Sequence, residues 1–213
     1  MQSAMPDPHS LLVFIAAGLL LNITPGPDVL YIVGRSISQG RIAGVVSTLG
    51  IATGCLCHLT AAALGLSALM LTLPLAYTVV RYAGAVYLVW LGLRAMASRS
   101  SPLQIQRAGS APLGRVFRQG MLTNVLNPKV ALFFLAFLPQ FTNAARGSLP
   151  LQIILLGLIF IANGTAVCIL YAIAASTLGD WLRTRYDIAA WLNRAMGGLF
   201  VGLGLRLALG DRR

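Results

Sequence analysis

Two stretches of this sequence decide its fold: Asn22-Ile23-Thr24-Pro25-Gly26-Pro27-Asp28 and Asn124-Val125-Leu126-Asn127-Pro128-Lys129. Each lies inside a long apolar run, and each contains proline, which lacks a backbone N–H and interrupts a helix. A helix that crosses a bilayer satisfies its backbone hydrogen bonds internally, so an interruption leaves polar groups exposed at membrane depth. The sequence therefore predicts two broken membrane helices, each with a polar gap near its middle.

The composition is typical of a polytopic membrane protein. Of the 213 residues, 57% are hydrophobic and 10% are charged, and the mean hydropathy is +0.80. A soluble domain carries about 25% charged residues, whereas about 20 consecutive apolar residues cross the hydrocarbon core as a helix. We expect an all-α fold with about six spans, at residues 10–34, 43–70, 75–97, 119–141, 149–176 and 190–210.

We expect one integral membrane domain over residues 1–213, divided into two halves of three spans. The halves cover about residues 10–97 and 119–210, and the polar connection at about 98–118 joins them. Because each half holds an odd number of spans, equivalent helices enter from opposite faces of the membrane, which makes an inverted repeat.

The spacing around the two breaks supports this repeat. Gly18 precedes Asn22 by four residues in the first half, and Gly120 precedes Asn124 by four residues in the second. A proline break follows in each case. Inverted repeats with broken helices are typical of secondary transporters.

The basic residues predict the orientation. Fifteen arginines and one lysine against five aspartates give a formal charge of +11. The arginines lie in short connections between apolar runs, which is typical of topology signals and excludes a nucleic-acid-binding face. Ten lie in the first, third and fifth connections and five elsewhere, which favours a cytoplasmic side for these connections and for residues 98–118, with both termini outside. The three arginines near the C-terminus favour the opposite orientation.

The cysteines predict no cofactor. Cys55, Cys57 and Cys168 all lie inside expected spans, which does not suit a secreted disulfide framework. Cys55, Cys57 and His58 have neither the spacing of a haem-attachment motif nor a shared helix face. We interpret them as helix-packing residues and expect no metal ion at the protein's site.

Small residues at helical spacing predict close helix packing, either within one subunit or in a homodimer. These pairs are Gly40 and Gly44, Gly50 and Gly54, and Gly198 and Gly202.

Asp28 and Lys129 follow prolines at matching positions of the two breaks. An ionised side chain near the bilayer centre costs about 2.5 to 3.5 kcal/mol, so each should face a cavity or a partner. One interpretation is a fixed ion pair that locks the two halves together. The other is a binding site, because one acid and one base match a zwitterion and helix ends at a break bind charged groups.

We predict a substrate-binding site from the polar and helix-breaking residues of both breaks, with Asp28 also as the proton-coupling residue. The predicted residues are Asn22, Thr24, Pro25, Gly26, Asp28, Asn124, Asn127, Pro128 and Lys129.

These motifs resemble a known family. The runs from Asn22 to Asp28 and from Asn127 to Lys129 are similar to the two signature motifs of the lysine exporter superfamily, in its homoserine/threonine (LysE/RhtB) branch. The resemblance extends over nearly the whole chain, through Gly84-Ala85-Val86-Tyr87-Leu88, Leu138-Pro139-Gln140-Phe141 and residues 197–204. It implies an inner-membrane amino-acid exporter, driven by the proton gradient, with its transport site at the breaks.

These features are compatible with more than one function. The leading hypothesis is a bacterial inner-membrane secondary transporter that exports a small neutral amino acid, such as threonine or homoserine, or a derivative, by proton antiport. A basic or branched-chain amino-acid exporter and a nontransporting scaffold are the alternatives. A membrane thiol carrier would need cysteines at the breaks, and neither break contains one. The expected partners are the amino-acid substrate and membrane lipid, with no nucleic acid.

Overall fold

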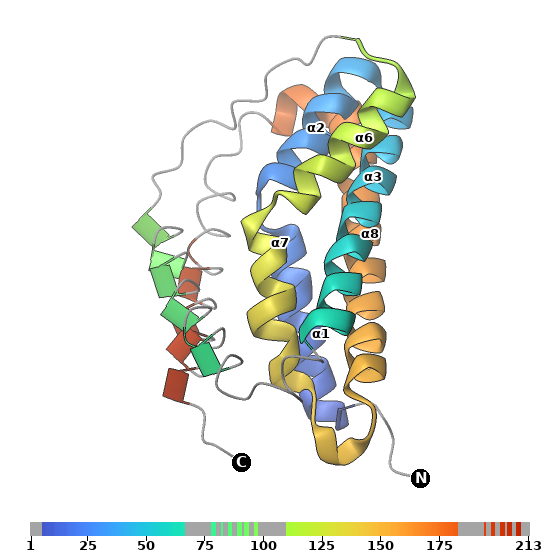
Figure 1. Cartoon of the computed structure of the whole chain (residues 1–213). Coiled ribbons are helices and arrows are strands. Elements are labelled where there is room, and N and C mark those ends of the chain that lie inside the picture. The colour runs from blue at the N-terminus through green and yellow to red at the C-terminus, as the bar shows by residue number, and fades with distance from the viewer. Residues whose placement is uncertain are drawn as a thin grey trace.

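The computed structural model describes residues 6–66 and 110–182, together with scattered helical positions between 78 and 97 and between 194 and 209. Every secondary-structure element in this part of the chain is helical (Figure 1), which confirms the expected all-α class. Within it, two helices are long and apolar enough to cross a membrane, or four if each of two bent pairs is one span. The spans expected at 75–97 and 190–210 lie largely outside the described residues.

The first broken span consists of α1 (Pro8–Ile23) and α2 (Pro27–Gln39), which are bent by 50° at their junction. Asp7 begins α1, because its carboxylate accepts a 3.0 Å hydrogen bond from the backbone N–H of Ser10. That hydrogen bond lowers the pKa of Asp7. Gly40, at φ +81°, ends α2 and allows the chain to turn directly into the next helix. The span therefore extends five residues beyond the expected end at 34.

The second broken span begins with α6 (Leu113–Val125) and α7 (Pro128–Leu132) and continues as the π-helical turn η2 (Phe133–Phe137) and the 3₁₀ turn η3 (Leu138–Phe141). The two parts are bent by 49°. The expected start at 119 was wrong, because α6 begins at Leu113. Arg115 and Arg118 lower the hydropathy there, but both side chains are exposed on a helix that continues past the apolar core.

Two long helices, α3 and α8, pack beside the broken spans. Helix α3 (Arg41–Ala61) continues as the π-helical turn η1 (Ala62–Leu66), and α8 (Leu149–Leu182) follows the 3₁₀ turn η4 (Ala144–Arg146). Helix α3 contacts α2, α6 and α8, and α8 also contacts α1 and α2. Helix α8 extends six residues past the expected end at 176, whereas the expected residues 67–70 of the second span lie outside the described part.

Glycines bring α3 close to α6. Gly50 and Gly54, one of the small-residue pairs expected from the sequence, make this contact within the subunit. A Cβ on Gly50 would overlap the carbonyl oxygen of Phe117, and one on Gly120 would lie 2.7 Å from the carbonyl oxygen of Ser47. Gly54 approaches the break in the same way, since a Cβ there would lie 2.8 Å from Cβ of Asn124. Helix α3 is therefore held directly against the second break.

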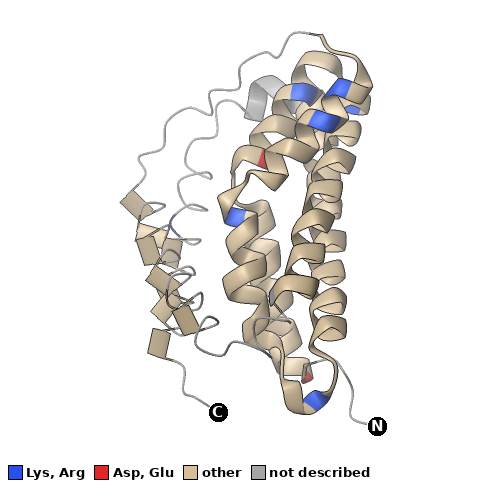
Figure 2. Cartoon of the chain, viewed as in Figure 1, with Lys and Arg blue, Asp and Glu red and all other residues tan. Residues whose placement is uncertain are grey.

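The bundle has one strongly basic end. Figure 2 shows basic residues gathered where α2 ends and α3 and α6 begin. They include Arg35, Arg41, Arg115 and Arg118.

Hydrogen bonds between α2 and α6 close this basic end. Arg35 is buried and donates to Oε1 of Gln39 at 2.8 Å and to Oε1 of Gln119 at 2.7 Å. The hydroxyl of Tyr31 donates to the carbonyl oxygen of Val116 at 2.8 Å. The two halves of the molecule are thus joined here by polar contacts.

Phenylalanines pack between the first and second halves toward the opposite end. The ring of Phe14 on α1 lies 5.7 Å from that of Phe133, 6.0 Å from Phe137 and 5.3 Å from Phe141, measured between centroids. All four side chains are buried.

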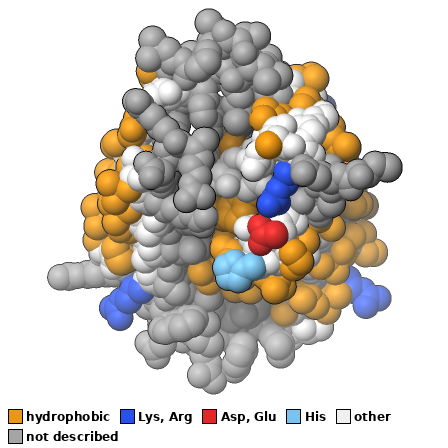
Figure 3. All heavy atoms as spheres, turned by 90° about the horizontal axis from the view of Figure 1, so that it is seen from below, with side chains coloured by type: hydrophobic (Ala, Val, Ile, Leu, Met, Phe, Trp, Pro, Cys, Tyr) orange, Lys and Arg blue, Asp and Glu red, His pale blue; other side chains and the backbone are white. Residues whose placement is uncertain are grey.

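This end also carries an exposed ion pair, Arg146 with Asp7 at 3.8 Å. Figure 3 shows the adjacent acidic and basic side chains from below.

Candidate functional site

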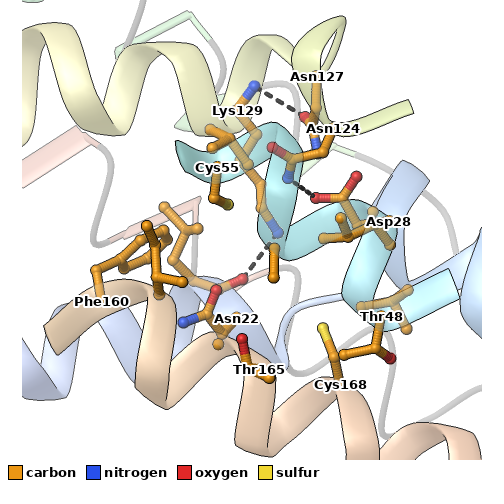
Figure 4. Close-up of a pocket in the computed structure, with 18 residues that line it drawn as sticks. Asn22, Asp28, Thr48, Cys55, Asn124, Asn127, Lys129, Phe160, Thr165 and Cys168 are labelled. Carbon is orange, nitrogen blue, oxygen red and sulfur yellow. Dashed lines mark hydrogen bonds between the residues drawn. The ribbon is translucent and has the colours of Figure 1, made fainter. Parts of the chain in front are cut away.

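The two breaks face a shared cavity that α3 and α8 complete. Figure 4 shows polar side chains from both breaks pointing toward one another across it. Its volume is about 510 Å³, including the part that opens to the surroundings. The breaks line it with Leu21, Asn22, Gly26, Asp28, Val29, Asn124, Asn127, Lys129 and Val130.

Lys129 connects the second break to the first. Its Nζ donates to the carbonyl oxygens of Leu21, at 2.8 Å, and Thr24, at 3.0 Å. These carbonyls lie at the C-terminal end of α1, where a helix has unpaired acceptors and a partial negative charge. Gly26 lies beside this contact, because a Cβ there would be 3.4 Å from Nζ, in ordinary van der Waals contact. A cation from one half therefore completes the helix end of the other.

Asp28 makes the reciprocal contact. Its Oδ2 accepts a 2.8 Å hydrogen bond from Nδ2 of Asn124, which lies in the last turn of α6. Asp28 also lies in the first turn of α2, where the helix dipole favours a negative charge. The acid of the first break is thus held by a neutral amide of the second.

Asp28 and Lys129, which are both described, are not paired with each other. Each has the different partners given above. This conformation therefore does not contain the fixed ion pair that one interpretation of the sequence predicted, although both residues line the same cavity.

Four buried polar atoms around the breaks have no hydrogen-bond partner. Two are donors, Nδ2 of Asn22 and Nδ2 of Asn127, and two are acceptors, Oδ1 of Asp28 and Oδ1 of Asn124. Leaving a buried polar group unpaired costs about 1 to 3 kcal/mol, so such groups are usually explained by a ligand or a functional requirement. All four residues line the cavity. They offer it donors for an anionic group and acceptors for a cationic one.

The structure brings six of the nine predicted site residues to the cavity, namely Asn22, Gly26, Asp28, Asn124, Asn127 and Lys129. The remaining three, Thr24, Pro25 and Pro128, are not among its lining residues. The hydroxyl of Thr24 instead donates to the carbonyl oxygen of Leu20 at 2.7 Å. Pro25 contributes to the interruption, and Pro128 begins α7.

Twelve of the 18 lining residues were not predicted from the sequence. Three of them, Leu21, Val29 and Val130, lie beside the breaks, and the other nine come from the unbroken helices α3 and α8, whose small and apolar residues resemble ordinary packing positions. Among them, the lack of a side chain at Gly164 weakly indicates a position facing the first break, because a Cβ there would lie 3.1 Å from the amide of Asn22. These wall residues are Thr48, Ile51, Ala52 and Cys55 of α3, and Phe160, Ile161, Gly164, Thr165 and Cys168 of α8.

A central cavity between two inverted broken helices, within a bundle of apolar spans, defines the class of a membrane translocator. The match with known proteins agrees with this class. Residues 19–211 match the family model described as LysE type translocator, so the chain belongs to that family. Its members are transporters rather than enzymes, and the chain is a membrane protein that exports amino acids.

Three relatives cover nearly the whole chain. The homoserine/homoserine lactone efflux protein of Salmonella typhimurium is 30% identical over 195 residues, which are 92% of this chain and 94% of that protein. An uncharacterized membrane protein of Vibrio cholerae is 28% identical and covers 95% of this chain and 98% of its own. The membrane protein YrhP of Bacillus subtilis, also uncharacterized, is 29% identical, with 94% and 99% covered. No solved structure matches the chain.

Proposed function

We propose that the protein exports a small neutral amino acid, such as threonine or homoserine, or a close derivative, from the bacterial cytoplasm in exchange for protons. One observation carries the proposal: residues that line the cavity hold four buried polar atoms without a hydrogen-bond partner, two donors and two acceptors. An amino acid presents a carboxylate that needs donors and an ammonium group that needs acceptors. The printed function of the Salmonella relative, efflux of homoserine and its lactone, supports this substrate class.

The lining favours a neutral side chain. Asp28 is the one acid among the lining residues, and an ammonium group of any amino acid already requires it. A lysine or arginine side chain would need a second anionic group, whereas Thr48 and Thr165 offer hydroxyls to a polar neutral side chain. Lysine export remains the alternative, with backbone carbonyls in place of that second anion.

Asp28 supports proton antiport, because its free Oδ1 can hold an ammonium group or a proton but not both. The carboxylate attracts the substrate, and the protonated acid does not. The substrate therefore displaces a proton on one side of the membrane, and a proton displaces the substrate on the other. Export of a neutral zwitterion against one entering proton gains about 2.3 kcal/mol per 100 mV of membrane potential.

The charge distribution supports an inner-membrane orientation. The end where α2, α3 and α6 meet carries the arginines Arg35, Arg41, Arg115 and Arg118 (Figure 2). Basic residues concentrate on the cytoplasmic side of a membrane protein. We therefore place this end in the cytoplasm and the start of α1 outside.

The test is counterflow with the full-length protein in liposomes, loaded in turn with homoserine, threonine, leucine or lysine. We expect exchange of labelled homoserine or threonine, and faster uptake into the vesicles when a pH gradient is imposed. A preference for lysine would overturn the neutral-substrate assignment. Absence of exchange for every amino acid would leave a nontransporting scaffold as the better description.

A variant links this assay to the cavity. Asn22→Ala removes an unpaired donor without breaking an existing hydrogen bond of its side chain. We expect the KM to rise about tenfold, because a hydrogen bond to a charged group contributes about 1.5 kcal/mol. Asn143→Ala, in the exposed turn before η4, is the matched control and should leave KM unchanged. Equal KM values for both variants would exclude Asn22 from substrate binding.

A further inference from the structure

His58 lies at the second break, and it was not among the site residues predicted from the sequence. It belongs to the last turn of α3, and its Nε2 lies 3.1 Å from the carbonyl oxygen of Asn124. A carbonyl oxygen only accepts hydrogen bonds, so Nε2 carries a proton in this contact. The imidazole ring also stacks on Phe134, with 6.1 Å between centroids and an interplanar angle of 15°. The ring is therefore held in place on two sides.

This contact repeats the arrangement at the first break. There, Lys129 donates to the carbonyl oxygens of Leu21 and Thr24 at the C-terminal end of α1. Here, His58 donates to the carbonyl oxygen of Asn124 at the C-terminal end of α6. In an inverted repeat these helix ends are equivalent, and the C-terminal end of each helix favours a cation. His58 is thus the counterpart of Lys129.

The two basic residues differ in chemistry. Lys129 carries an ammonium group, whereas His58 carries an imidazole, which proteins commonly use to pass protons. Asn124 places this imidazole next to the predicted proton site, because its Nδ2 donates to Asp28 at 2.8 Å while its carbonyl accepts from His58. One residue thus contacts both groups.

The charged and titratable groups around this position are few among the described residues. Asp28 comes from α2, Lys129 from α7, Cys55 from α3 and Cys168 from α8. The contacts of His58 with α6 and η2 are to Asn124 and Phe134, which do not titrate. A charge on His58 therefore acts chiefly with Asp28 and against Lys129.

We propose that His58 is a second proton-binding residue of the exporter, through which protons reach Asp28 from the outer side; this rests on the function proposed above. Helix α3 begins at the basic end, passes the cavity at Thr48, Ile51 and Cys55, and reaches His58 one turn further on. His58 thus lies on the side of the cavity away from the cytoplasm. After the substrate leaves, an imidazolium N–H bond breaks and an O–H bond forms on Asp28, so both groups become neutral.

The test replaces His58 by a residue that keeps the hydrogen bond but does not titrate. In His58→Gln the amide Nε2 can donate to the carbonyl oxygen of Asn124. His9→Gln is the matched control, because His9 is exposed at the start of α1. Each variant is reconstituted, and counterflow and gradient-driven uptake are measured at several values of pH on the outer side.

For His58→Gln we expect counterflow close to wild type, but gradient-driven transport about tenfold lower, within the usual range of coupling between sites. Its rate should no longer respond to outer pH between about 5 and 8, the range in which histidine titrates. His9→Gln should behave as wild type. An unchanged pH profile in His58→Gln would overturn the proposal and leave His58 as a structural cap.

A second measurement decides the case in which His58→Gln loses counterflow as well. In wild-type protein with ¹⁵N-labelled histidine, the imidazole signals of His58, assigned with His9→Gln, should change as the pH is varied. Asp28→Asn should shift that titration. Absence of titration, or an identical titration in Asp28→Asn, would overturn the proposal. If wild type exchanges no amino acid at all, the proposed function fails, while this measurement still decides whether His58 and Asp28 share proton binding.

Discussion

The two broken spans are similar in geometry and different in how their helix ends are completed. The bends are 50° and 49°, with Thr24–Gly26 between α1 and α2 and residues 126–127 between α6 and α7. At the first break, acceptors on α1 receive the ammonium of Lys129 and the hydroxyl of Tyr171. At the second, an acceptor on α6 receives the imidazole of His58. The first break is thus completed by an ammonium group and a hydroxyl, and the second by an imidazole.

The comparison also shows that neither break is complete alone. Lys129 of the second half binds carbonyls of the first, and Asn124 of the second half binds Asp28 of the first. Unpaired backbone groups are costly in a membrane, so the two halves stabilise each other at this point. A displacement of one half relative to the other must exchange these partners, and a bound substrate can supply replacements.

Lys129→Met should have the largest effect on this arrangement. It leaves the carbonyl oxygens of Leu21 and Thr24 without their donor, and each unpaired buried acceptor costs about 1 to 3 kcal/mol. We expect transport to fall about 100-fold, because two such acceptors together cost about 2 to 6 kcal/mol, and about 2.8 kcal/mol corresponds to a factor of 100. The midpoint of thermal unfolding in detergent should also fall.

Arg146→Met, at the end of the bundle opposite the basic end, is the control for loss of a positive charge. It should change neither quantity. Wild-type transport in Lys129→Met would show that the first break does not need a cation, and the comparison of the two breaks would then lose its basis.

Asp28→Asn should separate substrate exchange from proton coupling. The amide keeps the shape of the side chain but cannot bind a proton in the same range, so gradient-driven transport should be lost. Counterflow should persist with a raised KM, because Oδ1 can still accept from the ammonium group. Asp7→Asn is the matched control, since asparagine also caps a helix. Gradient-driven transport at the wild-type rate in Asp28→Asn would exclude Asp28 as the proton site.

Much of the first break and part of the second could be predicted from the sequence. Proline and glycine interrupt an apolar run visibly, and Asp28 and Lys129 stand out because charges are rare inside spans. His58 could not be assigned in this way, because its partner is a backbone carbonyl 66 positions away in the sequence. Because it follows Cys55 and Cys57, it resembled a helix-packing residue. The two cysteines themselves differ in environment, since Cys55 is buried and Cys57 is exposed.

The walls and boundaries were predicted less well, for two physical reasons. Gly164 and Thr165 of α8 are common membrane-helix residues, and only their position opposite Asn22 makes them part of the cavity. Hydropathy locates the apolar core of a span but not the end of its helix. Helix α6 therefore begins at Leu113 rather than at 119, and α8 continues to Leu182.

Gly50→Ala should weaken the second break selectively. Its Cβ would overlap the carbonyl oxygen of Phe117 and push α3 away from α6, together with the contact between His58 and Asn124. We expect a loss of about 1 to 3 kcal/mol in the free energy of unfolding, as for other overpacked positions. Gly114→Ala is the control, because nothing lies within 4 Å of its added Cβ. Equal stability of the two variants, measured by denaturation in detergent, would show that α3 and α6 do not need this close approach.

Tyr171→Phe should have the smallest effect and tests how firmly the first break is fixed. Its hydroxyl donates to the carbonyl oxygen of Ile23 at 2.6 Å, next to the acceptors of Lys129. Hydrogen bonds between membrane helices contribute about 0.6 kcal/mol on average, so transport should stay within about twofold of wild type. Tyr31→Phe removes the equivalent bond to Val116 at the basic end and is the matched control. A loss as large as that of Lys129→Met, in the same counterflow assay, would mean that the hydroxyl of Tyr171 contributes as much as Lys129 to holding the end of α1.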